Sequence, residues 1–166
     1  MLELKRFNRT VEGFFPKLSL KEMSQIALIT LIILLIITRV FVPVIVMGNS
    51  MRKTLENGDI LILYKGAYVK QAPKYKDIVI IKVNDDFNED TIVKRVIGTP
   101  GDRIVITDDK VYINGDLLTE DYINNEELVA GNYHIDITLE KNEIFVMGYN
   151  RNHSSDSRNP NLGVIN

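Results

Sequence analysis

The stretch Ile26-Ala-Leu-Ile-Thr-Leu-Ile-Ile-Leu-Leu-Ile-Ile37 divides the chain into two parts of different character. Only Thr30 interrupts its apolar side chains, and the largely apolar composition extends over Met23–Val42. A helix needs about 20 largely apolar residues to cross the hydrocarbon core of a bilayer. The sequence therefore predicts a transmembrane anchor over residues 23–42, in which Arg39 can extend its charged head to the interface.

A removable secretory leader is one alternative, but it would have a shorter apolar core and a small-residue cleavage site. No alanine lies between Ala27 and Ala67, so no Ala-x-Ala site follows the run. A buried core helix is the other alternative, and an all-apolar run after a basic segment disfavours it. That segment carries five cationic side chains, Lys5, Arg6, Arg9, Lys17 and Lys21. The positive-inside bias predicts that residues 1–22 are cytoplasmic and residues 43–166 extracytoplasmic.

The body after Pro43 has short β-branched and apolar runs separated by turn signals, which is typical of an antiparallel, partly closed β fold. Asn114-Gly115 is a strong hairpin turn, and Asp108-Asp109 predicts another. Asn84–Asp90 is expected to be a solvated acidic loop. The predicted strands are Asp59–Leu63, Asp77–Val83, Thr91–Ile97, Arg103–Thr107, Lys110–Ile113, Ile135–Leu139 and Glu143–Met147.

Composition excludes several kinds of site in this chain of 166 residues. It has no cysteine, which excludes disulfides, a thiol nucleophile and thiolate metal ligands. Its two histidines are not spaced like a zinc ligand pair, so neither a metal nor a cofactor is predicted. A net charge of -2 argues against a nucleic-acid partner.

Ser50 and Lys94 are the residues where covalent chemistry is conceivable. A nucleophilic serine needs a base, and a lysine can serve if its surroundings disfavour the ammonium form. If residues 91–98 form a strand, alternation places Ile92, Lys94, Val96 and Gly98 on one face, so Lys94 has only apolar or absent side chains beside it. A loop hydroxyl and a strand lysine whose head reaches solvent remain the alternatives.

Four blocks of sequence together resemble the signature boxes of type I signal peptidases, in that family's order and after an N-terminal anchor. They are Val46-Met-Gly-Asn-Ser-Met-Arg-Lys-Thr-Leu55, Gly58-Asp-Ile-Leu-Ile-Leu63, Lys94-Arg-Val-Ile-Gly-Thr-Pro-Gly-Asp102 and Gly148-Tyr-Asn-Arg-Asn-His-Ser-Ser-Asp-Ser-Arg158. The resemblance covers most of the chain from residue 23. It implies a mainly β, signal-peptidase-like antiparallel catalytic domain over residues 43–166.

The resemblance also implies a role for each matching residue. Ser50 matches the nucleophile and Lys94 the general base. Ser154 matches a serine that hydrogen-bonds the base, and Asp156 and Arg158 match a charged pair that stabilises the framework. The Ser50 backbone N–H is the expected oxyanion donor, with Asn49 as a further candidate.

The chain departs from the family pattern at several positions. Lys53 replaces a proline after the nucleophile, Lys76 replaces a glycine, and Tyr149 replaces an aspartate. Gly48 stands where some members have a hydroxyl residue that helps to bind the oxyanion. The family continues into a further strand beyond Asn166, so a fragment or a short member is expected.

The function implied is a membrane-bound serine endopeptidase that removes signal peptides from exported preproteins, with the bilayer and preproteins as partners. A non-catalytic, signal-peptidase-like membrane accessory for assembling surface structures is the alternative. An anchored ligand-binding module would explain the topology but not the four blocks. The oligomeric state and the preferred preproteins are left open.

Overall fold

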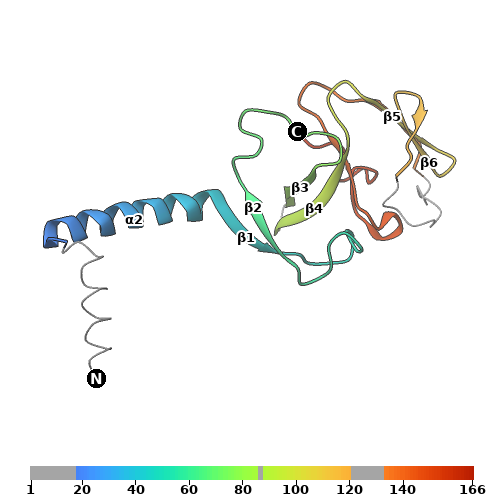
Figure 1. The fold of residues 1–166 in the computed structure, drawn as a ribbon. Coiled ribbons are helices and arrows are strands. Elements are labelled where there is room, and N and C mark those ends of the chain that lie inside the picture. Colours follow the sequence, from blue (N-terminus) through green and yellow to red (C-terminus); the bar gives the residue numbers. More distant parts are fainter. Residues whose placement is uncertain (1–17, 86–87, 121–132) are drawn as a thin grey trace, which may run out of the picture. The chain divides into compact units, whose positions relative to one another are not determined.

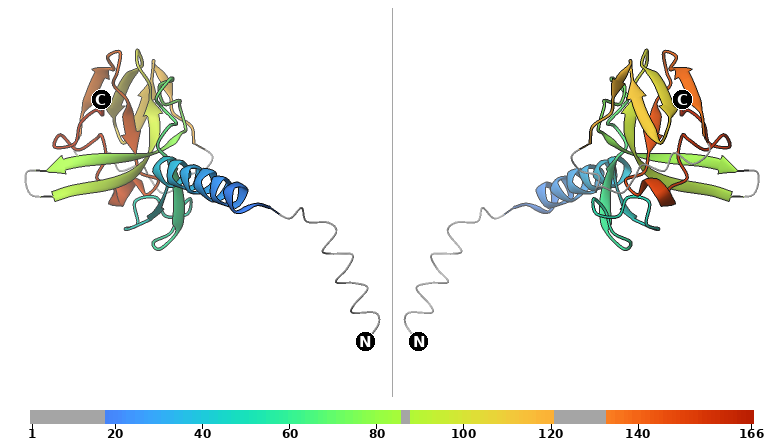
Figure 2. Two further views of the ribbon diagram at one scale, coloured as in Figure 1. Left: turned by 90° about the vertical axis from the view of Figure 1, so that its left-hand side faces the viewer. Right: turned by 90° about the vertical axis from the view of Figure 1, so that its right-hand side faces the viewer.

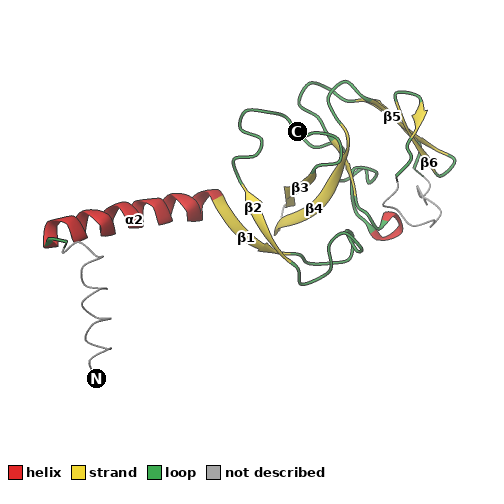
Figure 3. Ribbon diagram, viewed as in Figure 1, coloured by secondary structure: helices red, strands yellow, loops and turns green. Residues whose placement is uncertain are grey.

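The computed structural model describes residues 18–85, 88–120 and 133–166. These residues form one long helix and a set of short antiparallel strands joined by loops (Figures 1 and 3). The mainly β architecture with one N-terminal apolar helix confirms the predicted fold class. The chain divides into two compact units at the bond between Phe41 and Val42.

Helix α2 covers Leu20–Val40 and has the composition of a membrane span. Ser19 begins it with a capping box: its hydroxyl accepts a hydrogen bond from the Glu22 N–H at 3.3 Å, and the Glu22 carboxylate accepts one from the Ser19 N–H at 2.7 Å. Its 21 residues extend about 31 Å, which matches the hydrocarbon core of a bilayer. The hydroxyl of Thr38 donates to the Leu34 carbonyl at 3.0 Å, so this polar group is satisfied within the helix.

Strand β1, Phe41–Ile45, begins where the helix ends and was not predicted. The predicted anchor reached Val42, whereas the helix stops at Val40. Pro43 explains the difference, because proline disfavours helical geometry in the residue before it and cannot donate a helical hydrogen bond. Within the described residues, strand β1 pairs with β2, Ile60–Tyr64, in a two-stranded sheet whose edges tolerate proline.

A three-stranded sheet has the order β3-β4-β9, where β3 is Ile78–Asp85, β4 is Asn88–Gly98 and β9 is Phe145–Met147. Strands β3 and β4 form a long arm that extends from the rest of the body (Figure 2). The prediction of an acidic loop over Asn84–Asp90 is wrong, because pairing continues to Asp85 opposite Asn88. Backbone pairing does not depend on side-chain polarity, so acidic residues can extend a hairpin.

A four-stranded antiparallel sheet has the order β7-β6-β5-β8. Strands β5, Arg103–Thr107, and β6, Lys110–Ile113, have the predicted bounds. Asp108 and Asp109 between them both have positive φ, as do Asn114 and Gly115 before the short strand β7, Asp116–Leu117, which was not predicted. Both predicted turns are thereby confirmed. Strand β8 is Ile135–Thr138, and the predicted strands elsewhere differ from the observed ones by up to three residues at their ends.

The turn after β4 is closed by Asp102. Its carboxylate accepts hydrogen bonds from the backbone N–H and the hydroxyl of Thr99, both at 2.8 Å, and from the Asn114 amide at 2.8 Å. Gly101 beside it has a φ of 91°, a conformation that glycine adopts without strain. These contacts explain the Gly101-Asp102 part of the third sequence block.

Two apolar clusters form the core, and β9 separates them. Phe145 and Met147 belong to one cluster with Ile97, Ile104, Ile106, Val111 and Leu139. Val146 belongs to the other with Val79, Ile81, Val96 and Ile144. Because successive side chains of a strand point to opposite faces, β9 is buried on both sides. The fourth sequence block, which begins at Gly148, therefore follows directly from a strand that packing holds in place on both faces.

Candidate active site

Ser50 lies in the turn that follows β1. The backbone N–H of Asn150 donates to the Ser50 carbonyl at 2.8 Å, which joins the turn to the block after β9. The Asn57 side chain accepts from the Gly48 N–H at 2.9 Å, and Met51 anchors the turn in the core with 1% of its surface exposed. Ser50 is half-buried, and Asn49 before it is exposed.

Lys94 lies in the middle of β4, where it pairs with Val79 of β3. Only 3% of its surface is exposed. Two residues away on either side, Val96 belongs to the second apolar cluster and the partly buried Ile92 packs against that cluster. This confirms the prediction that Lys94 lies on a largely apolar face of its strand.

Gly98 does not share that face. The pairing of β4 with β9 shifts register between Val96 and Gly98, so the alternation breaks there. A Cβ at Gly98 would lie 2.7 Å from Ile104 and 2.8 Å from Leu139, both in the other apolar cluster. The expected placement of Gly98 beside Lys94 is therefore wrong.

Burial lowers the pKa of Lys94 from its ordinary value. The Asp156 charge opposes this effect and the Arg158 charge adds to it, so these groups act on Lys94. Among the described residues, no hydrogen bond or ion pair to the Lys94 ammonium is formed. A lysine with these surroundings can hold a neutral amine far more readily than a surface lysine.

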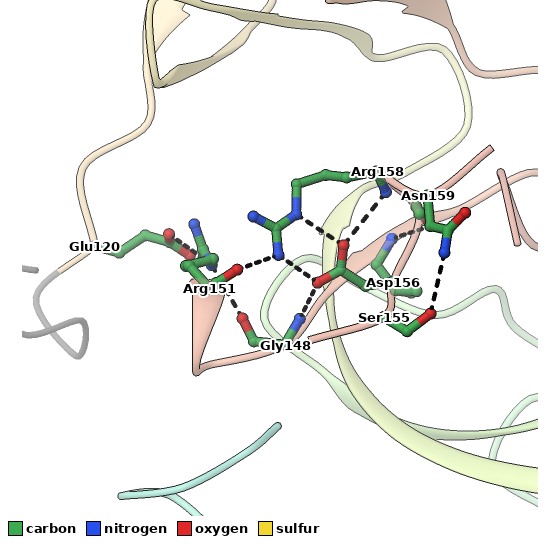
Figure 4. A network of polar contacts seen from close by, with 9 residues as sticks. Glu120, Gly148, Arg151, Ser155, Asp156, Arg158 and Asn159 are labelled. Carbon is green, nitrogen blue, oxygen red and sulfur yellow. Dashed lines mark hydrogen bonds and ion pairs between the residues drawn. The ribbon is translucent and has the colours of Figure 1, made fainter. Parts of the chain in front are cut away.

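Asp156 and Arg158 form a buried ion pair two residues apart (Figure 4). Asp156 Oδ1 accepts from Arg158 Nε at 2.8 Å, and Oδ2 accepts from Nη2 at 2.9 Å. The side chains are 0% and 5% exposed, respectively. Two parallel hydrogen bonds between a carboxylate and a guanidinium fix orientation as well as distance. The predicted charged pair is thus present.

Gly148 connects this pair to both serines. Its backbone N–H donates to Asp156 Oδ2 at 2.9 Å. A Cβ at position 148 would lie 2.1 Å from Ser154 Oγ and 2.8 Å from the Ser50 carbonyl oxygen. The buried Ser154 hydroxyl has no hydrogen-bond partner within the described part of the chain, so the expected bond to Lys94 is not made in this structure.

Two residues of this region had no role assigned from the sequence. Arg151, in the short helix η1 over Arg151–His153, lies inside the fourth block, and its buried guanidinium forms an ion pair with Glu120. Arg151 could have been singled out from the block, but Glu120 lies outside every block and no sequence signal marks it.

The geometry therefore brings the serine turn and the Asp–Arg framework together at Gly148, and that framework acts electrostatically on the buried Lys94. The family model described as signal peptidase, peptidase S26, matches residues 19–166. The chain belongs to this signal peptidase family.

Individual relatives agree with the family assignment. "Signal peptidase I P" of Bacillus subtilis subsp. natto is 34% identical over 150 residues, which cover 86% of this chain and 80% of the relative. "Signal peptidase I T" of Bacillus subtilis (strain 168) is 37% identical over 149 residues, covering 86% and 76%. A crystal structure of a signal peptidase I from Enterococcus faecalis V583 is 30% identical, covers 57% of this chain and 90% of its own, and gives a TM-score of 0.42.

The backbone clarifies two departures from the signal peptidase pattern. Lys76, at the family's glycine, has a φ of 73°, so glycine would suit this position. Lys53, at the family's proline, has a φ of 87°. Proline is restricted to a φ near about −65° and cannot adopt this conformation. The turn after Ser50 therefore has a backbone at position 53 that the family's proline would not fit.

Proposed function

We propose that the chain is a membrane-bound signal peptidase I in which Ser50 is the nucleophile and Lys94 the general base. The substrates are exported preproteins, from which it removes the N-terminal signal peptide. The burial of Lys94 in β4, at 3% exposure and with a lowered pKa, is the observation that carries the assignment of the base. Family membership supports the reaction.

In the proposed reaction, neutral Lys94 removes the proton from Ser50 Oγ as that oxygen attacks the scissile carbonyl carbon. The oxyanion of the tetrahedral intermediate accepts a hydrogen bond from the Ser50 backbone N–H. The intermediate collapses when the C–N bond breaks, and the Lys94 ammonium gives its proton to the leaving amine. This leaves the acyl group on Ser50 Oγ as an ester. Lys94 then takes a proton from water as the water oxygen attacks the ester carbonyl, and it returns that proton to Ser50 Oγ as the C–O bond breaks and the carboxylic acid product is released.

Ser154, Asp156 and Arg158 support this site in the proposal. The Ser154 hydroxyl is buried beside Gly148 and is free to hydrogen-bond the base when substrate enters. Asp156 accepts a hydrogen bond from the Gly148 N–H, and the charges of Asp156 and Arg158 act electrostatically on Lys94. Asn49 is exposed next to the nucleophile and remains a candidate second oxyanion donor.

We further propose that α2 spans the bilayer, with the basic segment before it in the cytoplasm and the body from residue 43 outside. The chain has no cysteine, so single cysteines report their own position. In intact cells or spheroplasts, Lys110→Cys should react with a membrane-impermeant maleimide and Lys5→Cys should not. The opposite pattern would reverse the topology.

Cleavage of a preprotein by the detergent-solubilised full chain tests the reaction. The wild type should release the signal peptide, whereas Ser50→Ala and Lys94→Arg should not, because arginine keeps its proton. Melting curves of the variants would show that they remain folded. Near-normal cleavage by either variant would exclude the dyad, and an inactive wild type would favour the non-catalytic accessory role.

A further inference from the structure

Glu120 and Arg151 form a buried ion pair next to the Asp156–Arg158 framework (Figure 4). Their side chains are 3% and 4% exposed, and Arg151 Nη2 donates to Glu120 Oε2. Removing two charges from water to this extent is unfavourable unless each compensates the other. The position of the Arg151 guanidinium therefore depends on Glu120.

Arg151 contacts the framework through both its side chain and its backbone. Its Nε donates to the Gly148 carbonyl at 3.0 Å, and its own carbonyl accepts from Arg158 Nη2 at 2.6 Å. Its Nη1 is buried and has no hydrogen-bond partner in the described part of the chain. Loss of the Glu120 contact would leave two nitrogens of this guanidinium unsatisfied.

Gly148 is consequently fixed from two directions. Asp156 holds its N–H at 2.9 Å, and Arg151 holds its carbonyl. The Cα of Gly148 lies against Ser154 and the Ser50 carbonyl without room for a methyl group. A rotation of the peptide bond after Gly148 would therefore move the surroundings of both serines.

We propose that Glu120 is a positioning residue of the peptidase site, which acts through Arg151 on the Gly148 carbonyl. The inference rests on the proposed function for its kinetic consequence. Glu120 aligns the groups that react without touching them, so its loss lowers kcat more than it alters KM. The pH midpoint of activity stays in place, because burial, Asp156 and Arg158 are the groups that set the lowered pKa of Lys94.

Glu120→Gln in the full-length chain tests the proposal, because glutamine keeps the shape of the side chain and removes its charge. We expect kcat for preprotein cleavage to fall about tenfold or more, with KM changed by less than about twofold. The assay temperature is set well below the melting temperature of each variant. A folded Glu120→Gln enzyme with kcat within about twofold of wild type would overturn the proposal.

Asp136→Asn is the matched control. It also removes a carboxylate from an Arg ion pair, with Arg103, but there the side chains are 54% and 59% exposed, respectively. This variant should keep the kcat and KM of the wild type. An equal loss in both variants would indicate a general effect of charge, and would count against a specific role for Glu120.

A double-mutant cycle tests whether Glu120 acts through Arg151. In an Arg151→Met background, Glu120→Gln should change kcat by less than about twofold, because the connection is already broken. Multiplicative losses in kcat would show that the two residues act independently, and the proposed route would be wrong.

Hydrogen exchange separates this inference from the proposed function. Glu120→Gln should speed amide exchange in residues 148–154 and leave residues 103–113 unchanged. This readout does not require activity, so it holds even if the wild type cleaves no preprotein. Unchanged exchange in residues 148–154 would overturn the positioning role whatever the activity.

Discussion

Gly148 lies so close to Ser154 that a Cβ at position 148 would be 2.1 Å from the Ser154 hydroxyl oxygen and 2.5 Å from its Cβ. The same Cβ would be 2.8 Å from the Ser50 backbone carbonyl oxygen. One of these neighbours is backbone, which cannot move away by a change of rotamer. The approach of the two serine segments therefore requires glycine at this position.

Gly148→Ala should inactivate the enzyme and lower its stability by about 1–3 kcal/mol, the usual range for overpacking a buried site. Preprotein cleavage and thermal unfolding measure the two effects. Gly66→Ala is the control: the atoms nearest to its Cβ would be those at the ring end of the exposed Tyr64, which belong to a side chain and not to the backbone. Equal behaviour of the two variants would contradict the steric argument.

Lys94 should give activity a pH dependence unlike that of a surface lysine. Cleavage should rise with pH through a midpoint below the ordinary lysine value of about 10.4, because burial lowers the pKa of Lys94 and only the neutral amine can accept the Ser50 proton. The same group makes stability depend on pH. Between the lowered folded pKa and the unfolded value, the unfolded chain binds more protons, so wild-type stability rises with pH there.

Lys94→Met separates these two effects. It should be inactive yet more stable than wild type near neutral pH, because methionine does not incur the cost of burying a group that is protonated in the unfolded chain. The advantage should shrink as pH approaches about 10, where the unfolded lysine also loses its proton. Denaturant titrations at several pH values measure it, and a pH-independent difference would argue against a titrating Lys94.

Asp156→Asn should be strongly destabilising, because it leaves Arg158 buried without its counter-charge. The expected loss is about 3–5 kcal/mol. Asp136→Asn, which breaks the exposed pair with Arg103, should cost less than about 1 kcal/mol. Urea unfolding of both variants tests the contrast between buried and exposed pairs. Comparable losses in the free energy of unfolding would show that the buried Asp156–Arg158 pair stabilises the fold no more than the exposed pair does.

Lys53 offers a test of the backbone itself. Lys53→Pro should lower the melting temperature although proline is the family's residue, because the observed φ of 87° is closed to proline. Lys53→Gly should be neutral or stabilising, since glycine adopts positive φ without steric cost. A higher melting temperature for the proline variant would show that this turn has a negative φ at position 53.

The sequence predicted those features that depend on local interactions. An apolar run interrupted only by Thr30 specifies α2, because a helix satisfies its own backbone groups in lipid. The Asp108-Asp109 and Asn114-Gly115 turns followed from residues that tolerate positive φ, and they gave β5 and β6 their correct bounds. Alternation in β4 placed Lys94 beside apolar side chains, but it left open whether the head of this lysine reaches solvent.

The motif blocks named the candidate residues Ser50, Lys94, Ser154, Asp156 and Arg158, but only the tertiary structure shows how their segments meet. The bulge after Val96 turns Gly98 away from Lys94, because pairing with β9 overrides simple alternation. The Glu120–Arg151 pair joins segments 31 residues apart. A charge pattern along the chain cannot reveal such a contact, since it arises only when the packing of the sheets removes both groups from water together.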